Sequence, residues 1–286
     1  MSERLIGIIG GSGFYQMEGF EIIEERKILT PFGAPSDAIV IGRLGDKKVA
    51  FLPRHGKGHR LSPTAINYCA NIYAMKMLGV ERLVSISAVG SLKEEIRPGD
   101  LVIVDQFIDR TKFRPQTFFD DGITAHVAFA HPVCSDLSSI LYSTAKSLGL
   151  VVHNGGTYVC MEGPAFSTRA ESFLYRQWGA SLIGMTNMPE AKLAREAELC
   201  YSTIALATDY DCWREEEHVD IETIVATLKK NVVNAQRVLK AAVERIPGDR
   251  KCGCANALSG AIMTDGKLIS KETKKKLDAI AGRYLK

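Results

Sequence analysis

Two aspartates in the C-terminal half of the chain could supply an acid. They lie in Thr208-Asp209-Tyr210-Asp211-Cys212-Trp213, directly after the apolar run Tyr201–Ala207. Because successive side chains of an extended segment point to opposite faces, Asp209 and Asp211 should share one side. Neighbouring carboxylates oppose each other's ionisation, so one can keep its proton near neutral pH and donate it. Helix capping by Asp211 and metal binding are the alternatives, although no histidine or further carboxylate stands at suitable local spacing for a metal.

An arginine and several small donor residues follow other apolar runs. Arg54-His55-Gly56 comes after Val49–Leu52. The planar fork of arginine suits an oxyanion, and histidine can add a donor. Further donors lie in Gly10-Gly11-Ser12-Gly13, in Ser85-Ile86-Ser87-Ala88-Val89-Gly90-Ser91 and at Thr186. Since α/β sheets bind ligands at strand ends, this equipment predicts a site for phosphate or a similar oxyanion. A tight glycine turn and surface charges are the alternatives; a dinucleotide fingerprint fails at Gln16.

Two loops carry side chains that a plain connection would not need. After Glu162-Gly163-Pro164, Thr168 can cap a helix with Glu171 at capping-box distance. This leaves Phe166 unexplained, and an aromatic ring at a loop apex often stacks on a planar ligand. Residues 105–131 form the second loop, with aromatic and basic side chains that indicate a functional or interface element.

The elements that must position these residues alternate along the chain. Short apolar runs predict strands at Leu5–Ile9, Ala38–Ile41, Val49–Leu52, Leu83–Ile86, Leu101–Val104, Val151–Cys160, Leu182–Met185 and Tyr201–Ala207. Helical spacing predicts helices at Thr64–Leu78, Ser135–Leu148, Thr168–Trp178, Pro189–Leu199, Ile221–Ile246 and Lys271–Tyr284. This alternation predicts an α/β fold, a single domain with a central mixed twisted sheet flanked by helices. We expect this α/β domain to span residues 1–246, with a C-terminal extension over 247–286 that carries a Cys-x-Cys motif and a helix.

Composition narrows the class of protein. The 286 residues are 46% hydrophobic and 24% charged with a net charge of +3, which excludes disorder and favours neither a nucleic-acid nor a membrane partner. Seven cysteines, an odd number, argue against a secreted disulfide framework. Cys252-Gly253-Cys254 has no second cysteine pair or histidine cluster near it in the sequence, so no zinc site is predicted. Without a targeting segment or a long apolar run, we expect a cytoplasmic protein.

Six motifs in this order resemble one known family. They are Gly10-Gly11-Ser12-Gly13, Thr30-Pro31-Phe32-Gly33, Arg54-His55-Gly56, Asp105-Gln106-Phe107-Ile108-Asp109-Arg110-Thr111, Glu162-Gly163-Pro164 and Thr208-Asp209-Tyr210-Asp211-Cys212-Trp213. Together they resemble the 5′-methylthioadenosine phosphorylases of the purine nucleoside phosphorylase superfamily, over about residues 5 to 245. The resemblance implies a purine nucleoside phosphorylase-like fold. It also implies a homo-oligomer, a trimer or a dimer of trimers.

The resemblance implies a role for each site residue. Phosphate would be bound by Ser12, Arg54, His55, Ser87, Ala88 and Thr186. Asp209 would protonate the purine N7, and Asp211 would accept from the exocyclic amine. The other substrate contacts would be Phe166 against the base, Ser167 setting base preference, Met185 beside the ribose, Tyr210 between the two aspartates, and His59 of a neighbouring subunit with Ile221 around the methylthio group. Ser12 and Ser87 stand where the family often has threonine, and both keep the hydroxyl.

The implied reaction is phosphorolysis of S-methyl-5′-thioadenosine to adenine and S-methyl-5-thio-α-D-ribose 1-phosphate. Phosphate is a co-substrate, and no cofactor or metal is expected. A carboxylate pair favours a 6-amino over a 6-oxo purine. A broader enzyme, one that takes inosine, guanosine or methylthioinosine, and a non-catalytic nucleoside-sensing domain are the alternatives. Cys252-Gly253-Cys254 also resembles the tails of heat-stable archaeal relatives that carry disulfides, which implies a bond from Cys200 or Cys134 to another cysteine.

Overall fold

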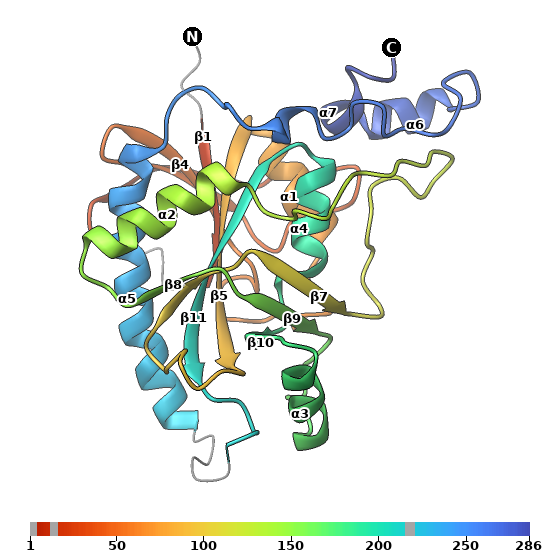
Figure 1. The fold of residues 1–286 in the computed structure, drawn as a ribbon. Helices are drawn as coiled ribbons and strands as arrows, with labels where there is room; N and C mark the ends of the chain where they lie inside the picture. The colour runs from red at the N-terminus through yellow and green to blue at the C-terminus, as the bar shows by residue number, and fades with distance from the viewer. Residues whose placement is uncertain (1–4, 12–16, 215–220) are drawn as a thin grey trace.

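A mixed sheet runs through the centre of the molecule (Figure 1). The computed structural model describes residues 5–11, 17–214 and 221–286. Its strands are β1 (Leu5–Gly10), β2 (Phe20–Arg26), β3 (Ile39–Leu44), β4 (Lys47–Pro53), β5 (Val80–Ser91), β6 (Leu101–Ile103), β7 (Gln106–Arg110), β8 (Val152–Asn154), β9 (Thr157–Met161), β10 (Leu182–Gly184) and β11 (Cys200–Asp209). The main path through the sheet is β2-β3-β4-β1-β5-β10-β9-β7, and β11 joins β5 to β6 and β8.

Strand β5 is the hub of this sheet. It pairs in parallel with β1 and β11, and its last residues pair antiparallel with β10. The ends of β1, β10 and β11 are therefore all fixed relative to one strand. The apolar runs predict most of these strands, but Val151–Cys160 is split into β8 and β9 at Gly155-Gly156. The split arises because the Gly156 N–H turns to the Asp105 carboxylate at 2.8 Å.

Helices cover both faces of the sheet. They are α1 (Tyr68–Met77), α2 (Ser135–Ser147), α3 (Arg169–Gln177), α4 (Asn187–Glu196), α5 (Ile221–Arg245), α6 (Lys271–Lys276) and α7 (Asp278–Ala281). The prediction for α1 is four residues too long at its start, because Asn67 and not the Pro63 region caps it by accepting from the Ala70 N–H. The capping box of Thr168 and Glu171 at the start of α3 is confirmed.

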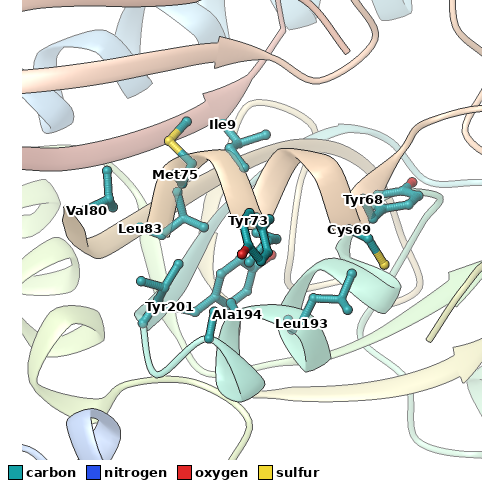
Figure 2. Close-up of a cluster of buried hydrophobic side chains, with 14 of the residues drawn as sticks. Ile9, Tyr68, Cys69, Tyr73, Met75, Val80, Leu83, Leu193, Ala194 and Tyr201 are labelled. Atoms are coloured by element: carbon teal, nitrogen blue, oxygen red, sulfur yellow. The ribbon is translucent and has the colours of Figure 1, made fainter. Parts of the chain in front are cut away.

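Two apolar cores separate the helices from the sheet. One contains side chains of α1 and α4, and the other contains side chains of α2 and α5. Neighbouring residues of β1 serve different cores, since Ile9 belongs to the first and Ile8 to the second. Figure 2 shows part of the first core, where Tyr73 of α1 and Ala194 of α4 lie close together over the sheet. The predicted α/β sheet flanked by helices is thus confirmed.

Residues beyond α5 pack against the body of the molecule. Leu277 and Ile280 belong to the same core as Tyr73 of α1. The Tyr73 hydroxyl also donates to the Lys276 carbonyl at 2.9 Å. The single helix expected over Lys271–Tyr284 is instead α6 followed by α7, because the backbone leaves helical geometry at Leu277. Among the described residues, no helix has the length and apolarity to span a bilayer.

Candidate active site

The predicted phosphate residues gather around β5 because of the strand register. Gly10 at the end of β1 pairs with Pro53, and the next residue, Arg54, donates its N–H to the Gly10 carbonyl at 2.9 Å. A Cβ added at Gly11 would meet nothing within 4 Å, so this turn borders open space. Ser12 lies outside the described residues.

Arg54 is buried, and most of its N–H groups donate to other groups of the protein. Its Nε and Nη2 donate to the two carboxylate oxygens of Glu190 at 2.7 and 3.0 Å. Nη2 also donates to Ser85 Oγ at 2.6 Å, and Nη1 donates to the Ile86 carbonyl at 2.8 Å. The planar fork that the sequence assigns to an oxyanion therefore holds Glu190. One hydrogen of Nη1 has no partner among the described residues and can be donated to a ligand, because a guanidinium has five donors.

Two histidines stack beside Arg54. The rings of His55 and His59 are 4.1 Å apart and nearly parallel, and His55 Nδ1 lies 2.9 Å from the Leu61 carbonyl. Burial, and then the charge of Arg54, lower the pKa of His55 to about 4. Neutral His55 donates from Nδ1 to that carbonyl, so its Nε2 is an acceptor and not the donor expected from the sequence. The His59 of this chain therefore lies against its own His55.

Hydroxyl groups meet where β5, β9 and β10 come together. Ser87 Oγ of β5 lies 3.1 Å from Thr186 Oγ1, which follows β10, and 3.2 Å from the Tyr158 hydroxyl. Thr186 occupies the N-cap position of α4 but caps no backbone N–H. Ala88 is exposed although Ser87 and Val89 on either side of it are buried. An open space therefore lies over this part of the strand, next to hydroxyl groups that can turn toward a ligand.

Met185 and the Glu162 turn are held by Arg114, a buried residue of the long loop. Arg114 Nη1 donates to the Met185 carbonyl at 2.7 Å, and Arg114 Nε donates to Glu162 at 3.0 Å. Glu162 also accepts from the Thr64 hydroxyl at 2.5 Å. Burial opposes ionisation of Glu162, but the hydrogen bonds that its carboxylate accepts outweigh this effect and lower its pKa to about 2. Gly163 has a left-handed φ of 70°, which favours glycine, and a Cβ there would lie 2.6 Å from Met185 Sδ.

The two aspartates approach one point, Gly90 of β5. A Cβ built on Gly90 would lie 3.1 Å from Asp209 Oδ1 and 3.3 Å from the Asp211 Cβ. β11 ends at Asp209, and Asp211 has a left-handed φ of 52° in the turn that follows. The expected strand alternation is therefore not what brings them together. Instead, the Asp211 N–H folds back onto Asp209 Oδ1 at 2.8 Å.

Burial shifts the pKa of both aspartates upward. Burial raises the pKa of Asp209, although hydrogen bonds from Thr208 and from the Asp211 N–H oppose the rise. Burial also raises the pKa of Asp211, with a smaller contribution from the charge of Asp209. Asp211 accepts from the Ser172 hydroxyl at 2.5 Å. A carboxyl group with a raised pKa holds its proton more readily than an exposed one and is a candidate general acid.

The remaining predicted substrate residues are Phe166, Ser167, Tyr210 and Ile221. Phe166 is 73% exposed, and the next residue, Ser167, lies beside the aspartate turn, since Cys212 Sγ donates to the Ser167 carbonyl at 3.5 Å. Tyr210 is not brought to the site: its ring packs against Trp213 in a third core, and its hydroxyl donates to the Glu94 carbonyl. The side chain of Ile221 lies outside what the structure describes.

Two charged residues at the site escaped the motif analysis. Glu190 is fully buried beneath the phosphate residues, and Arg114 is buried beneath Met185. Neither position has a local signal beyond its residue type, because their partners are 136 and 48 residues away in the sequence. The aspartates form no metal-ligand group: within the described residues, the one cluster of candidate ligands consists of cysteines far from this site.

Comparisons with known proteins identify relatives of this chain. The family model described as the phosphorylase superfamily matches residues 5–244. The S-methyl-5′-thioadenosine phosphorylase of Geobacter sulfurreducens is 59% identical over 285 residues, which cover 99% of this chain and all of that protein. The solved methylthioadenosine phosphorylase from an antarctic soil metagenomic library is 50% identical, with a TM-score of 0.93 over 98% of this chain and 99% of that one. The Schistosoma mansoni methylthioadenosine phosphorylase, solved with adenine, is 36% identical with a TM-score of 0.86 over 91% of this chain and 99% of that one.

Proposed function

The chain belongs to the phosphorylase superfamily, and from this premise we propose that it cleaves S-methyl-5′-thioadenosine with phosphate. The products are adenine and S-methyl-5-thio-α-D-ribose 1-phosphate. The observation that carries the proposal is a spacing along β5. Ser87 adjoins the hydroxyl of Thr186, and Gly90 pairs with Asp209. Three residues of strand span about 10 Å, enough for a ribose between a phosphate and a purine.

The phosphate end supplies both donors and an acceptor. Ser87, Thr186 and the remaining Nη1 hydrogen of Arg54 donate to phosphate oxygens. Neutral His55 accepts the proton of a phosphate monohydrogen ion at Nε2. The exposed turn at Gly11 supports a further contact from Ser12. Glu190 does not touch phosphate; it fixes the orientation of Arg54.

Bond cleavage then separates charge across the sugar. The bond between C1′ and N9 breaks, and its electron pair goes to the purine while positive charge develops on the ribose. A phosphate oxygen forms the new bond to C1′ from below. Protonated Asp209 gives its proton to N7, which neutralises the leaving purine. The proton lost by phosphate equals the one gained by adenine, so the reaction balances once Asp209 regains a proton.

Asp211 sets the choice of base. A carboxylate can accept a hydrogen bond from a 6-amino group, whereas a 6-oxo group would face it with a second acceptor. Ser172 holds Asp211 in place through a 2.5 Å hydrogen bond. Preference for methylthioadenosine over inosine and guanosine follows from this contact.

We also propose that the enzyme acts as a homo-oligomer, a trimer or a dimer of trimers, in the cytoplasm. Large apolar side chains that are exposed in one chain support an interface, among them Phe113, 78% exposed, in the long loop. None of the seven cysteines forms a disulfide, which fits a reducing compartment. Light scattering of the purified protein gives the subunit number, and a monomer at micromolar concentration would contradict the oligomer.

A steady-state assay across nucleosides tests the proposed activity. Base release from methylthioadenosine, adenosine, inosine and guanosine is followed with and without phosphate. We expect turnover only with phosphate, and the highest kcat/KM for methylthioadenosine. Asp46→Asn, in the exposed β3–β4 turn, is a matched control that should behave as wild type. Binding of methylthioadenosine without turnover would instead indicate a nucleoside sensor.

A further inference from the structure

Four cysteines from three separate segments of the chain come together near the start of β11, at the end opposite Asp209. The Sγ atoms of Cys134, Cys200, Cys252 and Cys254 all lie within 4.8 Å of one another. Cys134 directly precedes α2, Cys200 begins β11, and Cys252 and Cys254 belong to the turn of the 3₁₀ helix at Gly253–Asn256. The sequence predicts no zinc site, because no second cysteine pair lies near Cys252 and Cys254 along the chain. The fold supplies that pair.

Hydrogen bonds hold the cysteine-bearing segments in place. The Cys134 N–H donates to the carbonyl of Tyr201, next to Cys200, at 2.8 Å. The segment around Cys252 and Cys254 is tied down on both sides: Arg250 donates to the Glu198 carbonyl at 2.8 Å, and the Leu258 N–H donates to the Glu198 carboxylate at 3.1 Å. The cluster is therefore assembled by the folded chain rather than by a flexible tail.

The sulfur spacing matches a metal better than disulfides. No cysteine of the seven is in a disulfide, and the sulfurs of Cys200 and Cys252 lie 3.3 Å apart. A disulfide needs about 2.05 Å and would draw the sulfurs into two separate pairs. Four thiolates around Zn²⁺ at about 2.3 Å stand about 3.8 Å from each other in a tetrahedron. We propose that Cys134, Cys200, Cys252 and Cys254 bind one Zn²⁺ ion.

The surroundings allow an ion to enter and balance its charge. A cavity of about 500 Å³ borders the cluster, and Cys252 is only partly buried. Basic and acidic side chains line this cavity together: Arg82, Arg250, Lys251, Asp136 and Asp249. When Zn²⁺ binds, four thiols release up to four protons, and the site carries a charge of about −2. Arg82 and Arg250, which also pair with Glu81 at 3.5 Å, and Lys251 offset part of that charge.

Zinc at this position would be structural. All four ligands come from the protein, which leaves no open coordination position for a substrate. The ion would join the segment after α5 to the starts of α2 and β11, at the end of β11 opposite Asp209. Loss of the ion should therefore lower thermal stability while leaving the chemistry at Asp209 in place.

Metal content of the full chain, purified under reducing conditions, is the primary test. We expect about one Zn²⁺ per chain by elemental analysis. The C252S/C254S double variant should lose it, and C69S, a change at a buried cysteine outside the cluster, should retain it. Melting temperature should fall on chelation for wild type and C69S. Wild-type zinc content that persists in the double variant would overturn the site.

Two further measurements test the zinc site even if the double variant fails to fold. Wild-type protein stripped of zinc and loaded with Co²⁺ should show the intense visible bands and the thiolate-to-metal charge-transfer band of tetrahedral sulfur coordination. Weak octahedral bands would contradict the proposal. Intact-mass analysis without reductant distinguishes zinc binding from disulfide formation. Metal-free protein that is lighter than the fully reduced chain by four hydrogen atoms would mean that two disulfides form in the cluster instead, and would contradict the proposal.

Discussion

Replacing Asp209 with asparagine separates proton donation from packing. Asparagine has the same shape, and its Oδ1 can keep the hydrogen bond from the Asp211 N–H. Its Nδ2 can donate to Thr208 Oγ1, whose hydrogen can turn to the Val89 carbonyl 3.1 Å away. Every local hydrogen bond thus has a substitute, and we expect D209N to cost less than about 1 kcal/mol of stability. The amide, however, cannot transfer a proton to N7.

The expected loss of rate follows from the loss of general acid catalysis. Such a group contributes about 10²- to 10⁴-fold, which corresponds to about 3 to 5 kcal/mol in activation free energy. We expect kcat for methylthioadenosine to fall by this factor in D209N, with little change in KM. Because burial raises the pKa of Asp209, wild-type kcat/KM should fall as pH rises through that pKa. D209N should lose this basic limb.

The assay is release of adenine at saturating phosphate across pH, with urea unfolding of the same samples. Asp46→Asn serves as the matched control, because it makes the same chemical change in an exposed turn. Near wild-type turnover in folded D209N would refute the acid role. An unchanged pH profile with reduced kcat would show that Asp209 acts by positioning alone.

Three other substitutions test the charged groups around the site. Glu190→Gln should destabilise the chain by about 3 to 5 kcal/mol in urea unfolding and raise the KM for phosphate, because it leaves the buried guanidinium of Arg54 without its counter-charge; equal stability would contradict the positioning role. Asp211→Asn should lower the kcat/KM ratio of methylthioadenosine to methylthioinosine by about tenfold or more, since an amide can donate to a 6-oxo group; an unchanged ratio would exclude Asp211 from base choice. Burial raises the pKa of Glu196 to about 7, so ionisation disfavours the folded state, and stability should fall by about 3 kcal/mol as pH rises from about 4.5 to above 7. Glu196→Gln should remove this fall, as unfolding at pH 5 and pH 8 would show.

Local sequence signals predicted most of the elements. The strand ends before Arg54 and Thr186 and at Asp209 follow from apolar runs, because burial of a short apolar run is a local property, whereas β5 continues past the expected end at Ile86 to Ser91. The capping box at Thr168 is equally local. Strands β2 and β7 escaped prediction because no residue of either is fully buried, so their sequences lack a buried face; β7 lies inside residues 105–131, which were expected to form a loop.

Long-range pairing could not be predicted. Arg54 looked free to bind an oxyanion because nothing near it in the sequence is acidic, and only the fold brings Glu190 beneath it. Arg114 likewise reads as part of a basic loop until Glu162 and the Met185 carbonyl meet it. The cysteines show the same effect, since spacing along the chain does not report that Cys134 and Cys200 lie beside Cys252.

The most direct test of the central claim is to identify the sugar product. Methylthioadenosine and inorganic phosphate are incubated with the wild-type protein, and the mixture is followed by phosphorus NMR while adenine is quantified. Phosphorolysis predicts a new sugar 1-phosphate signal that grows in equal molar amount with adenine. Adenine that accumulates with free methylthioribose, without a new phosphate ester, would mean hydrolysis and would contradict the account of the phosphate site.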